Sequence, residues 1–352
     1  DINIKNTTNQ PFNSFYFTLN PGLIVSELTV NGNTVDFIQK HQIVLIENVN
    51  LKANETANVA MTYGGAIDET IAHLEVEQDR YENPNEYFMF SPKKKYAFMK
   101  DDYVLLTKDV MWYPDTEIGY NHVAPAKPRR QLITFKLQVK PNEGLTPVSQ
   151  GAVTIESQQH TFTPEYPLTQ LSLAIGRYVQ KEITVDSVSY SVYHYPENTY
   201  FADQLNELSD TLSFLITDIV NEYEVQQQMS YPFKRLQFVE VPLHFRSYNK
   251  IYENHQAYIQ PETVYLPEQG GDIRTFDFRR QMRDMNRQSR QRNESLTEKE
   301  KQANIFKDLI KNVFTKQSGS MWFWDGRDPD EPDYSLFANY YDYNSGIVSE
   351  EL

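Results

Sequence analysis

Hydrophobic and polar positions alternate in short runs over the first part of the chain. The runs mix β-branched and aromatic residues with a partial period of two, and turn residues separate them at short intervals. The clearest pair, residues 23–30 and 33–37, flanks Asn31-Gly32, and Asn-Gly tolerates the positive φ angles of a type I′ turn. This pattern predicts a β-sandwich over residues 1–192. Further strands are predicted within residues 13–19, 41–49, 57–63, 130–139, 152–157, 159–164, 168–176, 178–185 and 187–195.

The hydrophobic period changes near Pro196. Apolar residues then recur three and four positions apart, which predicts a helix within residues 200–229 that ends before Tyr231-Pro232. We expect its apolar face to pack against a sheet containing residues 235–241, RLQFVEV. The face consists of Leu205, Leu208, Leu212, Leu215 and Ile219.

Two further helices are predicted, around residues 276–292 and 297–315. Thr297 with Glu300 fits a capping box at the start of the second. Its buried stripe is expected to be Phe306, Leu309, Ile310 and Val313. Residues 193–352 therefore read as an α+β domain, and the fold class as mainly β with α+β. The segment from Glu77 to Pro128 is rich in Pro, Tyr and charge, and we expect irregular loops without catalytic residues there.

Composition and charge exclude several classes. The 352 residues carry a net charge of −15 with a pI of about 5.0, which argues against a general nucleic-acid binder. The chain has no cysteine, so it has no disulfides, thiolate zinc sites or cysteine nucleophiles. No stretch approaches the roughly 20 apolar residues that a membrane span needs.

Four motifs carry a resemblance to a known family. FTLNPGLIVSELTVNG (17–32), WYP (112–114), FKLQVKPNEGLTPVSQG (135–151) and YPFKRLQFVEVP (231–242) resemble the gluzincin-type aminopeptidase N family. In that family a β-sandwich leads into a thermolysin-like catalytic domain. The resemblance implies an aminopeptidase-type sandwich over 1–192 and a smaller, degenerate thermolysin-like α+β domain over 193–352.

A narrower resemblance rests on three other stretches. KKKYAFMKDDYVLLTKDVMWYP (93–114), PLTQLSLAIGRY (167–178) and QPETVYLPEQG (260–270) are similar to the aminopeptidase-like region of large ABC transporter permeases of Bacteroidetes-type bacteria. This implies a fragment of a membrane protein at the periplasmic, extracytoplasmic face of the inner membrane. The implied partners are the transmembrane part of the same permease, its ATPase subunit, and a peptide or protein ligand.

The family's zinc chemistry needs two histidines four apart on a helix, with a Glu between them as general base. No two histidines of this chain are so spaced; they are His41, His73, His122, His160, His194, His244 and His255. We therefore expect no catalytic residues, no metal, no cofactor and no enzymatic activity, but substrate or partner binding coupled to transport. Two alternatives stay open: an active zinc aminopeptidase whose catalytic helix lies outside this chain, and a carbohydrate-binding β-sandwich protein.

A partner groove is suggested by part of the family's substrate-binding motif. Gly-Ala-Met-Glu-Asn aligns with KIYENHQAYIQPE so that Glu253, Asn254 and Glu262 coincide with family positions, whereas Gly, Ala and Met do not. The resemblance implies that Glu253 grips a free amine, and we include Glu268 in the groove. The alternative is a chance match on a solvated loop, with Glu240 and Glu262 paired to arginines on the surface.

Two other clusters have candidate binding roles. Six arginines between Arg279 and Arg292 could dock an acidic partner or anionic lipid headgroups, or form a solvated helix face. The aromatics of residues 321–343 suggest an interface or a sugar platform, or packing within a larger protein. The aromatic interface would include Trp322, Trp324, Tyr340 and Tyr341.

Overall fold

The computed structural model forms two compact units, residues 1–131 with 246–252, and residues 132–245 with 253–352. Strands predominate in the part of the chain that the structure describes, which confirms the expected mainly β class with α+β character. The domain boundary expected at residue 192 stays a prediction. The described residues are 1–69, 95–116, 132–198, 212–228, 230–242, 245, 259–268, 278–292 and 295–305.

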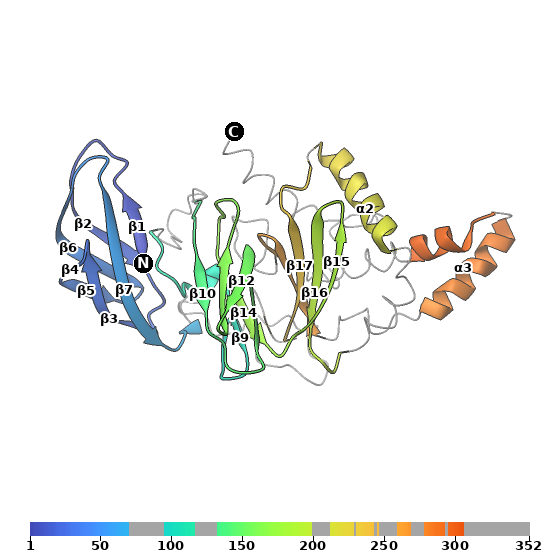
Figure 1. Cartoon of the computed structure of the whole chain (residues 1–352), viewed down its shortest axis with the longest axis horizontal. Helices are drawn as coiled ribbons and strands as arrows, with labels where there is room; N and C mark the ends of the chain where they lie inside the picture. The colour runs from blue at the N-terminus through green and yellow to red at the C-terminus, as the bar shows by residue number, and fades with distance from the viewer. Residues whose placement is uncertain are drawn as a thin grey trace, which may run out of the picture. The chain divides into compact units, whose positions relative to one another are not determined.

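The first unit contains two antiparallel sheets, drawn in blue in Figure 1. One has the strand order β1-β7-β3-β4 and the other the order β2-β6-β5. The strands are β1 (Ile2–Lys5), β2 (Phe12–Thr18), β3 (Leu23–Val30), β4 (Asn33–Thr34), β5 (Phe37–Lys40), β6 (Ile43–Leu51) and β7 (Thr56–Gly65).

A single apolar cluster lies between these two sheets. Leu28 and Val59 come from one sheet, and Phe17 and Ile46 come from the other; all are buried. Because one cluster draws on both sheets, the sheets pack face to face as a β-sandwich, as the alternating pattern predicts.

The β3–β4 hairpin turns at Asn31-Gly32, as predicted. Both turn residues have positive φ, 50° and 79°, which is the type I′ requirement. A bulge between Val25 and Glu27 shifts the register of β3 against β7. The bulge explains the imperfect alternation of LIVSELTV, because it lets both Val25 and Leu28 be buried although they are three residues apart.

The segment expected to be irregular contains a short hairpin within its described part. β8 (Phe98–Met99) pairs with β9 (Val104–Leu106), and the 3₁₀ helix η4 (Lys108–Val110) follows. Leu106 and Val110 are buried in a small apolar cluster with Tyr96 and Ala97. The expectation of loops alone was therefore wrong for this hairpin, because a few apolar residues in a polar, Pro-rich stretch suffice to anchor it.

The second unit is built around a five-stranded sheet of order β15-β16-β17-β19-β18. The pairs β16–β17 and β17–β19 are parallel, and β15–β16 and β18–β19 are antiparallel. Its central strand β17 is largely buried, which is typical of a strand covered on both faces. The strands of this sheet are β15 (Val179–Val185), β16 (Val188–His194), β17 (Arg235–Val241), β18 (Ile259–Gln260) and β19 (Thr263–Pro267). Five further strands of the second unit lie outside it: β10 (Leu137–Val139), β11 (Thr146–Ser149), β12 (Ala152–Glu156), β13 (Gln159–Thr163) and β14 (Leu173–Gly176).

Helix α2 (Leu212–Gln227) ends before Tyr231-Pro232, as predicted, and contacts β15 of the five-stranded sheet. Leu212 and Ile219 are half-buried, whereas Phe214 is exposed. Of the other expected face residues, Leu205, Leu208 and the side chain of Leu215 lie outside the described residues.

The remaining described helices are α3 (Phe278–Arg292) and residues 298–305. The capping box is confirmed: the Thr297 amide donates to Glu300 Oε2 at 2.7 Å, and the Glu300 amide donates to Thr297 Oγ1 at 3.3 Å. The stripe expected at Phe306, Leu309, Ile310 and Val313 lies outside the described residues. Among the described helices, none has both the length and the apolar character of a membrane span.

Candidate functional site

The candidate groove motif ends in a tight turn between β18 and β19. Gln260 pairs with Thr263, so Pro261 and Glu262 form a two-residue loop. Proline fixes its own φ near −65°. Glu262 has a φ of +57°, the left-handed backbone conformation that residues other than Gly rarely adopt. Surrounding contacts must therefore hold Glu262 in this conformation.

Those contacts involve both its backbone and its carboxylate. The backbone oxygen of Glu262 accepts a hydrogen bond from the Gln237 amide at 2.8 Å. Its Oε2 accepts one from the Gly151 amide at 2.7 Å and lies 3.7 Å from Arg235 Nη1. The residue is only 3% exposed. The arginine pair expected for Glu262 is therefore present, but it is buried and does not lie on the surface.

Gly151 has to be a glycine at this place. Its φ is +96°, and an added Cβ would lie 2.4 Å from the backbone atoms Thr163 C and Pro164 N. The absence of a side chain thus allows the chain after β11 to pass close to β13 and present its amide to Glu262.

The electrostatics of Glu262 follow from this burial. Desolvation raises the pKa of the carboxyl above its ordinary value, and the Arg235 guanidinium and the Gly151 amide oppose that rise. Burying the charged carboxylate therefore costs free energy unless the Arg235 guanidinium and the Gly151 amide both stay in place.

Glu240, on β17, is the second buried carboxylate of this sheet. Its Oε2 accepts from the Tyr195 amide and its Oε1 from Asn198 Nδ2, both at 2.7 Å. With 2% exposure it is buried, so the expectation of a surface ion pair for Glu240 was wrong. Its carboxylate serves to fix the chain that follows β16.

A third buried polar group joins β19 to the chain between β11 and β14. Ser172 Oγ accepts hydrogen bonds from Gln150 Nε2 at 2.6 Å and from the Tyr265 hydroxyl at 2.9 Å. The Ser172 amide donates to Gln150 Oε1 at 2.9 Å. Burial raises the pKa of Tyr265, so its hydroxyl stays protonated and donates. These bonds satisfy polar groups that would otherwise be costly to bury.

The described residues do not fit a zinc ion. No group of three or more His, Asp or Glu side chains among them is arranged to hold a metal. Of the three described histidines, His41 is in an exposed turn, His160 is half-buried on β13, and His194 Nδ1 lies 2.9 Å from the Tyr195 oxygen. The carboxylates of Glu240 and Glu262 already accept hydrogen bonds from protein donors.

The structure therefore places only part of the expected groove. Glu262 is inside the fold and Glu268 is half-buried just after β19. Glu253 and Asn254, like the aromatic-interface residues Trp322, Trp324, Tyr340 and Tyr341, lie outside the described residues. The groove and the aromatic interface stay predictions.

Sequence reasoning missed Arg235 and Gly151 as partners of Glu262. Arg235 is the first residue of β17, and a charged residue at the start of a largely buried strand was the available signal. No comparable signal marked Gly151, which lies 111 positions before Glu262 in the chain.

Comparison with solved structures finds M1 zinc metallopeptidases. The M1 zinc metallopeptidase from Deinococcus radiodurans aligns with a TM-score of 0.45 and 15% identity, over 77% of this chain and 57% of that chain. Aminopeptidase A of Legionella pneumophila, in complex with aspartic acid, aligns with a TM-score of 0.45 and 12% identity, over 72% of this chain and 26% of that chain. The chain thus spans little more than half the length of the first. No protein-family model and no curated protein matches the chain.

Proposed function

We propose that the chain is a non-catalytic, aminopeptidase-like module in the extracytoplasmic region of an ABC transporter permease. It acts by binding a substrate or partner and coupling that binding to transport. Its partners are the transmembrane part of the same permease, the ATPase subunit, and a peptide or protein ligand.

The proposal that the module is non-catalytic rests on one observation: both buried carboxylates already accept hydrogen bonds within the protein. Glu240 and Glu262 accept hydrogen bonds from backbone amides, and Glu262 also faces Arg235. They act as structural acceptors, which leaves them poorly suited to hold an amine or a metal. The histidine spacing of the sequence supports the same conclusion. The transport part rests on the three stretches that resemble permease regions.

A transport assay in the full-length permease tests the binding role. Glu253→Gln combined with Glu268→Gln changes groove residues without touching the buried Glu262, so the protein should accumulate normally while transport falls. Glu156→Gln on the exposed strand β12 is the matched control. Normal transport by the double variant at unchanged abundance would remove the basis for the groove.

A further inference from the structure

Helix α3 separates its residues into a packed face and an arginine face. Met282, Met285 and Ser289 recur at steps of three and four and are half-buried or buried. On another side, exposed arginines recur at steps of four, four and three. We call these residues the arginine face: Arg279, Arg283, Arg287 and Arg290.

These four charges have no acidic partner in the described part of the chain. The one ion pair within α3 joins Arg280 Nε to Asp284 Oδ2 at 3.9 Å, and both residues are well exposed. The protein as a whole carries a charge of −15. An acidic chain thus gathers positive charge on one exposed helix, although acidic side chains are plentiful elsewhere in its sequence.

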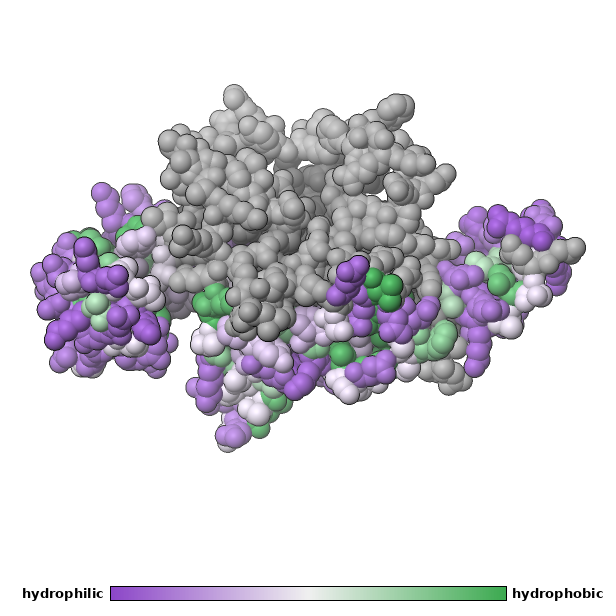
Figure 2. Space-filling view, turned by 90° about the horizontal axis from the view of Figure 1, so that it is seen from above, coloured by the Kyte–Doolittle hydropathy of each residue, from purple (hydrophilic) through white to green (hydrophobic). Residues whose placement is uncertain are grey.

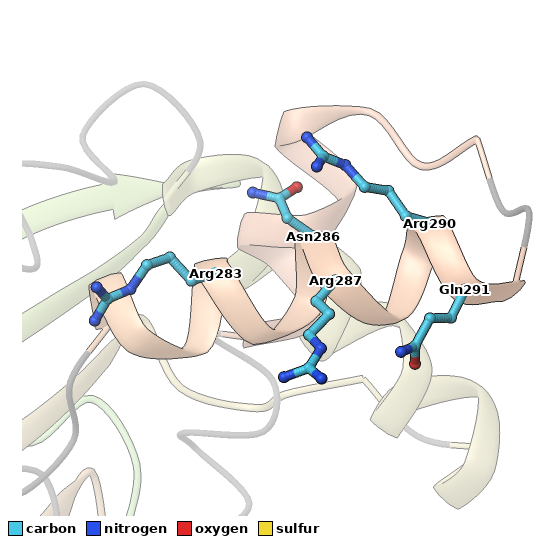
Figure 3. A pocket seen from close by; sticks show the side chains of 5 residues that line it. All are labelled: Arg283, Asn286, Arg287, Arg290 and Gln291. Carbon is cyan, nitrogen blue, oxygen red and sulfur yellow. The ribbon is translucent and has the colours of Figure 1, made fainter.

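Three residues of the arginine face, Arg283, Arg287 and Arg290, line a hollow together with Asn286 and Gln291. Figure 3 shows Arg290 and Asn286 directed to one side of the helix and Arg287 and Gln291 to the other, with Arg283 beside the first turn. All five side chains that line the hollow end in N–H donors. In Figure 2 the surface around α3, at the right, is mostly hydrophilic.

The chemistry of this face favours phosphate groups. α3 contains arginines and no lysine, and the planar guanidinium matches the oxygens of phosphate with two parallel hydrogen bonds. The outward positions carry no apolar or aromatic side chain, whereas the centre of a protein interface usually has such anchors. A protein partner is therefore a poorer match than a surface that presents phosphates.

The shape of the face favours a flat surface. Arg279 and Arg290 are eleven residues apart, which is about 17 Å along a helix. The four arginines start from one side of the helix, so their long side chains, although directed differently, can reach a plane that faces that side, where basic residues attract anionic headgroups. We propose that the arginine face of α3 binds the phosphate groups of an anionic phospholipid surface. The inference does not depend on the proposed transport role.

Vesicle binding by the full chain tests this surface. The protein should co-sediment with vesicles of phosphatidylcholine and phosphatidylglycerol at low ionic strength, but not with pure phosphatidylcholine, and salt should weaken the binding. Replacing Arg283, Arg287 and Arg290 together by Gln should lower the affinity about tenfold or more, since each basic residue contributes at the surface. The three side chains are exposed, so circular dichroism should stay unchanged.

Two matched variants separate the arginine face from charge in general. Replacing the same three arginines by Lys should restore much of the binding. Replacing the exposed Lys5, Lys40 and Lys52 by Gln removes an equal charge from the first unit and should leave the affinity unchanged. Equal binding by the Arg-to-Gln variant and the parent, or no binding to the anionic vesicles, would overturn the proposal. Binding of polyglutamate or of DNA as strong as that of the vesicles would also overturn it, in favour of an acidic polypeptide or a nucleic acid.

Discussion

Both units have apolar interiors, but among the described residues only the second unit also buries carboxylates. In the first unit, the space between the two sheets is filled by aliphatic and aromatic side chains such as Phe17, Leu28 and Ile46. In the second unit, the carboxylates of Glu240 and Glu262 are buried among the strands, each with protein donors.

Apolar packing and buried carboxylates differ in how strictly they determine the positions of neighbouring groups. The free energy of apolar packing is non-directional and roughly proportional to the apolar area buried. A buried carboxylate is favourable only when particular donors reach it, so it fixes where those donors lie. The Gly151 amide and Arg235 must both meet Glu262, and this requirement ties together three distant parts of the second unit.

The largest effect is expected for Glu262→Ala. The change leaves the Arg235 guanidinium, whose side chain is 17% exposed, without its partner, and the buried Gly151 amide without an acceptor. We expect a loss of about 3 to 5 kcal/mol in the free energy of unfolding, measured by urea denaturation. Glu262→Gln keeps an acceptor for Gly151 and should cost less. An alanine variant as stable as the parent would show that the buried pair does not hold the second unit.

A smaller loss is expected for Leu28→Ala in the first unit. Leu28 is 1% exposed, and the loss of its side chain should cost about 2 to 4 kcal/mol through lost burial and a residual cavity. Ile24→Ala on the same strand is the control, because Ile24 is 61% exposed. The cost of Leu28→Ala should be nearly independent of pH, in contrast to the next prediction, and a strong pH dependence would contradict an apolar interior.

The smallest effect is a pH dependence confined to the second unit. Burial raises the pKa of Glu262 above its ordinary value of 4.5, so the folded state binds a proton more readily than the unfolded state. Stability contributed by this group is therefore largest at low pH and falls as pH rises from about 4.5 through the folded pKa. Denaturation across this range should show the fall in the parent and not in Glu262→Gln. The same slope in both proteins would assign the dependence to other groups.

Local sequence signals predicted much of the fold. Asn31-Gly32 and the box of Thr297 and Glu300 act over two to four residues, and the structure confirms both. The β8–β9 hairpin escaped prediction because its few apolar residues lie in a polar segment. The bulge in β3 also escaped, since it disturbs the alternation by only one residue.

The candidate site was less predictable for a physical reason. Glu262 follows a proline in a turn-like stretch, and such a residue is usually solvated. Its burial depends on a glycine that lies 111 positions earlier and on an arginine at the start of another strand. Contacts over such separations leave no periodic trace in the sequence.

The central claim is that this module binds a substrate or partner and catalyses no reaction. The metal content and peptidase activity of the purified full chain test it most directly. The account predicts no stoichiometric zinc by elemental analysis and no cleavage of aminoacyl-nitroanilides, with or without added zinc. Stoichiometric zinc together with cleavage that a chelator abolishes would contradict it.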